Sequence, residues 1–309
     1  MAAGAMLIVR IAQIVFVQGV CGIIMDEMRS LSLSLIIPAY NESQYIDACL
    51  ESIARQTVQP LEVLVVDNNS SDDTVAVASR YPFVTILRET RQHQVYAQAA
   101  GFDAARGDVL GRIDADTILP NDWVERVCAH FQAHPSVMAV SGGARPYDVF
   151  FTGLGAAIFS LYHQKAARLA TGRTMILGAN CALRAAAWPD VRSTMHFRAD
   201  LWEDYDMAFH LPRGSVVQLP GLMVSMSFRA AHKKFVDVFR YQLRGFRTVG
   251  LHVSRLRAAF FTALRLTAIV WYPVVLVDNV LLRMRAASGG RMQPLDAYSK
   301  SSASPKPRK

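Results

Sequence analysis

The feature that most constrains the fold of this chain is a repeated pattern of short apolar runs, each followed by polar residues and then by helical spacing. The apolar runs are residues 33–37, 61–66, 83–87 and 109–113. Isoleucine and leucine recur at helical spacing after the first run, at Ile46, Leu50 and Ile53. Such alternation of strands and helices predicts a mostly parallel sheet joined by right-handed crossovers.

Polar side chains follow the ends of three of the predicted strands. They are Asn41, Asp67, Asp114 and Asp116. Ligands of open α/β sheets bind beyond the carboxyl ends of the strands. We therefore expect these four residues to converge on one crevice.

Asp114 and Asp116 are two residues apart at the end of the fourth predicted strand. In extended backbone, both side chains would point to the same side. Paired carboxylates suit a hard divalent cation such as Mg²⁺ or Mn²⁺, which also takes phosphate oxygens as ligands. Taken alone, the pair could equally be turn or capping residues. The ordered strands before it favour the metal interpretation.

Composition and charge exclude several classes of protein. The four cysteines, Cys21, Cys49, Cys128 and Cys181, are too scattered for a disulfide framework or a zinc site of paired cysteines. The formal net charge is +8, and residues 229–257 form a basic stretch. No nucleic-acid recognition motif accompanies it. Anionic lipid or a phosphorylated substrate is therefore the expected partner, and an ordinary solvated face is the alternative.

Four segments carry a resemblance to a known family: residues 37–42 (Ile-Pro-Ala-Tyr-Asn-Glu), 65–72 (Val-Val-Asp-Asn-Asn-Ser-Ser-Asp), 104–108 (Ala-Ala-Arg-Gly-Asp) and 113–116 (Ile-Asp-Ala-Asp). In this order they resemble the blocks of family-two inverting glycosyltransferases, which have the GT-A fold. The resemblance is close over residues 32–126 and looser over 126–235. It implies a mixed, mostly parallel central sheet flanked by helices, with apolar helices at the C-terminal end.

The resemblance also assigns a donor site. It implies that Pro38, Tyr40 and Glu42 line the pocket for the base and ribose of a nucleotide diphosphate sugar. Asp67 would hydrogen-bond the base. One departure concerns residues 91–94 (Arg-Gln-His-Gln), where the family often has Asn-x-Gly. This bulkier, basic loop could change the choice of donor.

The same resemblance assigns the metal. Asp114 would lie near the ribose and the metal, and Asp116 would bind the cation directly. Some relatives place a late histidine on the metal or the diphosphate, a position that His232 could fill here. A surface histidine among basic residues is an equal alternative for His232.

Two downstream segments resemble the acceptor half of the family. Residues 178–184 (Gly-Ala-Asn-Cys-Ala-Leu-Arg) look like its acceptor-side strand, and residues 202–206 (Trp-Glu-Asp-Tyr-Asp) look like its Glu-Asp motif. The resemblance implies Asp204 as general base, assisted by Glu203. A sugar hydroxyl is a weak nucleophile, so a positioned carboxylate must take its proton. Without the upstream blocks, an acidic helix start would be the simpler interpretation.

Apolar segments near both ends predict contact with a membrane. Residues 6–25 are apolar but contain Arg10, and they could be a weak membrane segment or an upstream extension. Residues 258–282 could span the hydrocarbon by length, but Arg265 and Asp278 make a simple span expensive. We expect helices that lie in the interface at the cytoplasmic face of the membrane. A pair of buried core helices is the alternative.

These expectations divide the chain into parts. They are an N-terminal extension (1–30), a catalytic domain (31–235) with a nucleotide-binding half (31–126) and an acceptor half (127–235), membrane-associated helices (236–286) and a basic tail (287–309). The predicted reaction moves a sugar from a nucleotide diphosphate to a glycan or lipid-linked acceptor hydroxyl, in cell-envelope synthesis.

Two other functions use similar features. A metal-dependent nucleotidyltransferase also needs paired aspartates, but it usually has a glycine-rich basic loop near its first strand, which residues 38–42 do not form. A non-catalytic membrane-bound scaffold would be expected to have lost Asp116 or Asp204, and both are present. The absence of a G-x-G-x-x-G after the first predicted strand argues against a dehydrogenase.

Overall fold

The structure is a computed structural model. It describes residues 30–149, 152–229 and 235–267, with three single positions further on. Residues 1–29, the predicted ligand His232, most of the apolar run 258–282 and the tail lie outside the described residues.

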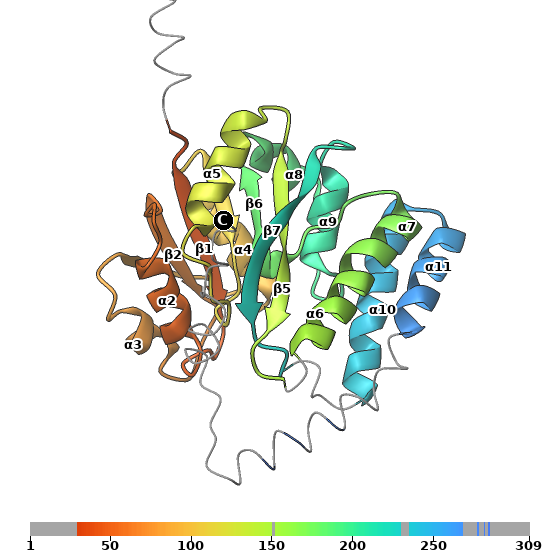
Figure 1. The fold of residues 1–309 in the computed structure, drawn as a ribbon, viewed down its shortest axis with the longest axis horizontal. Coiled ribbons are helices and arrows are strands. Elements are labelled where there is room, and N and C mark those ends of the chain that lie inside the picture. The colour runs from red at the N-terminus through yellow and green to blue at the C-terminus, as the bar shows by residue number, and fades with distance from the viewer. Residues whose placement is uncertain are drawn as a thin grey trace, which may run out of the picture. The chain divides into compact units, whose positions relative to one another are not determined.

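One seven-stranded sheet organises the chain from Ser32 onward, in the order β3-β2-β1-β4-β6-β5-β7 (Figure 1). Its strands are β1 (Leu33–Ala39), β2 (Glu62–Asp67), β3 (Val84–Arg88), β4 (Val109–Arg112), β5 (Ala139–Pro146), β6 (Cys181–Arg184) and β7 (Val216–Met226). Strands β1 to β4 pair in parallel, as predicted. Strand β6 is antiparallel to both β4 and β5, so the sheet is mixed.

The α-helices are α2 (Ile46–Ala54), α3 (Thr74–Ala78), α4 (Gln94–Ala104), α5 (Trp123–Ala133), α6 (Thr152–Ser160), α7 (Ala167–Thr171), α8 (Trp188–Thr194), α9 (Glu203–His210), α10 (Phe235–His252) and α11 (Arg255–Leu266). A π-helical segment, Leu161–Ala166, joins α6 to α7. Short 3-10 turns occupy Gly178–Asn180 and Ala185–Ala187. Figure 1 shows α6, α7, α10 and α11 gathered on the β5–β7 side of the sheet.

Every residue of strand β1 is buried. It pairs with β2 on one side and with β4 on the other. Strands buried on both faces read as continuous apolar runs, which explains the sequence signal here. The carboxyl ends of β1, β2 and β4 therefore open at the same edge of the sheet. Asp67 is not on the strand next to β4, however, because β1 lies between them.

Helices α10 and α11 pack against the domain that carries the sheet. Val249 of α10 and Ala258 and Phe261 of α11 are buried in the main hydrophobic cluster. The guanidinium of Arg265 lies 4.7 Å from the ring centroid of Trp202, the residue before α9. Among the helices that the structure describes, none is both long enough and apolar enough to cross a membrane.

Candidate functional site

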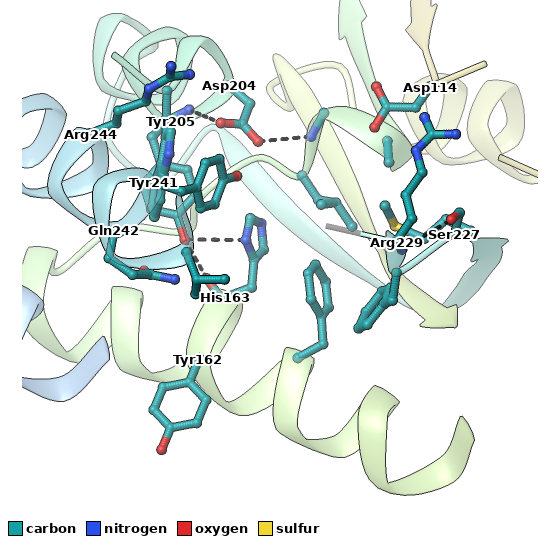
Figure 2. Close-up of a pocket in the computed structure, with 18 of the residues that line it drawn as sticks. Asp114, Tyr162, His163, Asp204, Tyr205, Ser227, Arg229, Tyr241, Gln242 and Arg244 are labelled. Atoms are coloured by element: carbon teal, nitrogen blue, oxygen red, sulfur yellow. Dashed lines mark hydrogen bonds between the residues drawn. The ribbon is translucent and has the colours of Figure 1, made fainter. Parts of the chain in front are cut away.

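A cavity of about 1160 Å³ opens where the end of β4, the start of α9 and helices α6 and α10 meet. Among its lining residues are four predicted site residues, Asp114, Asp116, Glu203 and Asp204, and a fifth acidic residue, Asp237 of α10. Figure 2 shows the carboxyl groups of Asp204 and Asp114 on opposite sides of this space, with Arg229 on the Asp114 side. The structure thus brings the predicted metal residues and the predicted general base to one cavity.

The two aspartates after β4 sit in a turn and not in extended backbone. Strand β4 ends at Arg112, and the Thr117 N–H donates to the Asp114 carbonyl at 3.0 Å. The extended backbone on which that expectation depended does not continue to Asp116. The turn still directs both side chains into the cavity, where Asp116 is the more deeply buried of the two.

Asp116 is buried among other charged side chains of the site. Burial raises the pKa of its carboxyl well above the ordinary value, Asp114 adds to the effect, and Arg229 opposes it. The guanidinium of Arg229 lies 3.2 Å from Asp116 Oδ2 and also pairs with Glu42. Asp116 Oδ1 is buried with no hydrogen-bond partner among the described residues. An oxygen in that state fits a hard cation ligand.

Arg112 holds the two halves of the site together. Its side chain is buried under the cavity floor, where Nη2 lies 3.0 Å from Asp114 Oδ1 and 3.5 Å from Glu203 Oε1. Gln94 Nε2 donates to the same Asp114 oxygen at 3.0 Å. A buried charge needs such partners, because desolvation is costly. Arg112 therefore fixes the orientation of both carboxylates.

Gly178 makes room for Arg112. A Cβ at position 178 would lie 1.8 Å from Arg112 Nη1, a distance that real atoms do not reach. The Gly178 N–H also donates to Asp204 Oδ2 at 3.1 Å. Gly178 thus leaves space for the Arg112 side chain and also holds the carboxylate of Asp204, the predicted base.

We expect Gly178→Ala to lower the free energy of unfolding by about 1–3 kcal/mol, because overpacking forces Arg112 away from its partners. Activity should fall as well, since Asp114 and Glu203 lose their shared guanidinium. Urea denaturation followed by circular dichroism measures the first effect. Gly153→Ala is the control, because a Cβ there meets nothing within 4 Å. Equal stability of the two variants would contradict this role.

Asp204 is held in place by backbone groups at the start of α9. Its Oδ2 accepts from Gly178 and its Oδ1 accepts from the Tyr205 N–H at 2.8 Å. Burial raises the pKa of Asp204 well above the ordinary value, and the neighbouring Glu203 carboxylate adds to this. A carboxylate with a raised pKa takes a proton more readily, which suits a general base. Asp204 can therefore be both an acidic residue at the start of helix α9 and the predicted general base.

Aromatic and basic side chains form the wall opposite β4. Tyr241 and Arg244 come from α10, and His163 comes from the π-helical segment (Figure 2). The Tyr205 hydroxyl donates to the His163 carbonyl at 3.0 Å. His163 stacks on Phe159, with ring centroids 5.1 Å apart. Such flat faces suit the apolar side of a sugar or an acceptor group.

His163 predicts a measurable pH dependence. Burial, followed by the charge of Arg265, lowers the pKa of His163 from 6.5 to about 3. The unfolded chain takes up a proton near pH 6.5 while the folded chain does not, so stability is lost as the pH falls from 6.5 toward 3. We expect His163→Gln to make this decline shallower, measured as urea midpoints at pH 7.5 and pH 5. His134→Gln, at an exposed position, is the control; identical slopes for all three proteins would refute the prediction.

Four predicted donor residues, all within the described part of the chain, are not among the residues that line this cavity: Pro38, Tyr40, Glu42 and Asp67. Pro38 is the sixth residue of β1, and Tyr40 is 50% exposed just after that strand. Asp67 is buried and its Oδ1 accepts from the Ser70 N–H at 3.0 Å. Glu42 connects to the cavity through its ion pair with Arg229. The assignment of these residues to the base and ribose stays a prediction.

Two site residues escaped the sequence analysis. Arg112 stands in the apolar run 109–113, and a charge there signals a buried partner, so it could have been singled out. Arg229 begins the basic stretch 229–257 and is indistinguishable by sequence from the solvated charges around it. Its role depends on the antiparallel bridge between Ile118 and Ser225, which brings the end of β7 beside the aspartate turn.

The site and the sheet define a class of protein, the nucleotide-sugar transferases with the GT-A fold. The profile of glycosyl transferase family 2 matches residues 34–188, half of the chain. The chain therefore belongs to glycosyl transferase family 2. Chondroitin synthase of Escherichia coli is 33% identical over 120 residues, and AglE, a glycosyltransferase of Haloferax volcanii, is 38% identical over 101 residues.

These curated relatives are longer than the matched region. The alignments cover 38% and 30% of this chain, and 18% and 33% of chondroitin synthase and AglE respectively. The chain thus spans a third or less of these two relatives.

Solved structures share the fold over most of the chain. A mannosyltransferase from Pyrobaculum calidifontis, in complex with GDP-Man and Mn²⁺, superposes with a TM-score of 0.53 and 20% identity, over 89% of this chain and 88% of that one. TarS of S. aureus (residues 1–349), in complex with UDP-GlcNAc, gives a TM-score of 0.55 and 16% identity, over 75% and 71%. The predicted fold class, GT-A with a mixed sheet flanked by helices, is confirmed.

Proposed function

We propose that this glycosyltransferase inverts the anomeric configuration of a sugar that it takes from a nucleotide diphosphate donor. The observation that carries the proposal is the shared cavity, in which the Asp114–Asp116 turn faces the Glu203–Asp204 helix start. One side offers the carboxylate oxygens of the aspartate turn next to Arg229. The other side offers the Asp204 carboxylate, which backbone N–H groups hold in place. Direct displacement needs both at once, on opposite sides of the reacting carbon.

In the proposed reaction, Asp204 takes the proton of the acceptor hydroxyl as its oxygen attacks the anomeric carbon. The bond from that carbon to the diphosphate breaks, and the electron pair stays on the phosphate oxygen. Gly178 and Tyr205 hold the Asp204 carboxylate through their backbone N–H groups. The Arg112 guanidinium holds the carboxylates of Asp114 and Glu203 in place.

The leaving diphosphate gains negative charge, and the wall around Asp116 can balance it. Arg229 supplies a guanidinium within the site, and Arg244 supplies another from α10. Asp116 and Asp114 would hold a divalent cation, Mg²⁺ or Mn²⁺, which stabilises charge on phosphate oxygens when bound. Two fold relatives were crystallised with Mn²⁺ and a nucleotide sugar, which supports this assignment.

Two measurements test the proposal. Thermal stabilisation by UDP, GDP, dTDP and CDP, each with and without Mn²⁺, should show a metal-dependent increase for at least one nucleotide. The matching sugar nucleotide should then be hydrolysed slowly with water as acceptor. Proton NMR during the first minutes should show the released sugar with inverted anomeric configuration. Release of the retained anomer would contradict the inverting mechanism.

We further propose that the acceptor is lipid-linked and that the enzyme acts at the cytoplasmic face of a membrane, in cell-envelope synthesis. Helix α10 supports this, because Val236, Phe239 and Phe246 are exposed on it beside Arg240 and Arg247. Exposed aromatic side chains next to arginines are typical of helices in a lipid interface.

We expect the double substitution Phe239→Ser and Phe246→Ser to weaken co-sedimentation with vesicles that contain anionic lipid. The reason is that less apolar surface enters the interface. Val58→Ser with Leu61→Ser, two exposed apolar positions before β2, is the control. Unchanged vesicle binding of the α10 variant would rule out this surface.

A further inference from the structure

A second cluster of ionisable side chains lies outside the catalytic cavity. Asp206 and His210 come from α9, four residues apart and therefore on one face of the helix. His196 comes from the segment between α8 and α9, and His252 is the last residue of α10. None of the four is among the residues that line the cavity in the described part of the chain.

Their ligand atoms are close together. His252 Nε2 lies 2.7 Å and His196 Nδ1 lies 2.9 Å from Asp206 Oδ1, and His210 Nε2 lies 3.6 Å from Asp206 Oδ2. One ring nitrogen from each histidine and one carboxylate oxygen of Asp206 all lie within 4.8 Å of one another. The three imidazole rings have centroids 5.1–5.6 Å apart, so they surround one point.

Two observations indicate that this cluster is more than a set of hydrogen bonds. His210 Nε2 is buried without a hydrogen-bond partner among the described residues, although its lone pair or proton needs one. Asp206 is fully buried, and the His196 backbone N–H fixes its Oδ2 at 2.7 Å. An orienting contact of this kind behind a carboxylate is typical of metal ligands.

We propose that His196, Asp206, His210 and His252 bind one Zn²⁺ ion. Zinc takes four nitrogen, oxygen or sulfur ligands in a tetrahedron at about 2.0–2.2 Å, which places ligand atoms about 3.4 Å apart. The observed separations bracket that value. Three imidazoles favour zinc over magnesium or calcium, which prefer oxygen ligands. The site thus differs in chemistry from the carboxylates of the catalytic cavity.

The zinc ion joins the C-terminal end of α10 to α9. The first turn of α9 carries Glu203 and Asp204, and α10 supplies Tyr241 and Arg244 to the cavity wall. The Trp202 N–H, just before α9, donates to Thr248 Oγ1 of α10 at 2.8 Å, so the two helices also meet next to the cavity. A metal link therefore stabilises the wall of the active site without touching the substrate.

Cobalt spectroscopy tests the site directly. The full chain, produced without a polyhistidine tag and treated with chelator, is titrated with Co²⁺. Tetrahedral Co²⁺ absorbs strongly in the visible range, whereas octahedral Co²⁺ on oxygen ligands absorbs weakly. We expect a strong band that saturates at about one equivalent. Added Zn²⁺ should remove it, and Asp116→Asn should leave it unchanged.

Matched variants identify the ligands. His196→Gln and His210→Gln should each weaken Co²⁺ binding at least about 100-fold. His134→Gln, on an exposed position of the surface, should bind as the unchanged chain does. His196 is the more exposed ligand, with 38% of its side chain accessible, so its variant is expected to fold if the one at His210 does not.

A thermal melt gives an independent readout. Zn²⁺ should raise the melting temperature of the unchanged chain and of Asp116→Asn, but not that of His196→Gln. Absence of a tetrahedral band in the unchanged chain overturns the proposal. The same band in His196→Gln and His210→Gln, with unchanged affinity, overturns it as well.

Discussion

Asp204→Asn is expected to lower turnover by roughly 10²–10⁴-fold, the usual contribution of a positioned general base. The asparagine side chain has the same size but cannot take the proton of the acceptor hydroxyl. Donor binding should survive, because Asp114 lies across the cavity from Asp204 (Figure 2) and Asp116 belongs to the same turn as Asp114. Initial rates with the donor found in the nucleotide screen measure the effect.

A structural contribution must be separated from the catalytic one. Both carboxyl oxygens of Asp204 accept backbone N–H groups, so the amide of asparagine loses one of these bonds. That loss costs about 1–3 kcal/mol of stability, which a urea titration detects. Glu203→Gln should cost less activity if Glu203 only assists. A dead Glu203→Gln beside an active Asp204→Asn would exchange the two roles.

Asp116→Asn should lower turnover at least about 10³-fold, because a bound cation contributes several kcal/mol to stabilising a leaving diphosphate. Stabilisation by nucleotide with Mn²⁺ should also disappear. Without metal, Asp116→Asn should be at least as stable to unfolding as the unchanged chain. The reason is that a buried carboxylate with a raised pKa costs energy when it ionises.

Asp122→Asn is the matched control, because Asp122 precedes α5 and its side chain is 49% exposed. It should keep both nucleotide binding and turnover. Full activity of Asp116→Asn in excess EDTA would show that this aspartate does not bind an essential metal.

The first half of the fold could be predicted from the sequence for a physical reason. Strands β1, β2 and β4 are almost entirely buried, so each appears as a mostly apolar run that is followed by polar residues. The second half carries no such signal. Strand β5 carries two glycines and an arginine, and β7 is partly exposed along its length. Their order in the sheet depends on tertiary contacts.

The candidate catalytic residues divide in the same way. Asp114, Asp116, Glu203 and Asp204 follow from motifs, because each sits at the end or the beginning of an element. Arg112, which orients two of them, does not, since it lies 91 residues from Glu203 in the chain and meets it only in the folded protein. Asp114 and Asp116 share the cavity through a turn and not through extended backbone. Asn41 and Asp67, which were expected in the same crevice, are not among the residues that line it.

The most direct test compares nucleotide binding and turnover in three proteins: the unchanged chain, Asp204→Asn and Asp116→Asn. Isothermal titration calorimetry with the preferred nucleoside diphosphate and Mn²⁺ measures binding, and initial rates measure turnover. Asp204→Asn should bind as the unchanged chain does while losing turnover, and Asp116→Asn should lose both. Loss of nucleotide binding in Asp204→Asn, or retention of normal turnover in either variant, would contradict the division of the site into a metal–donor side and a base.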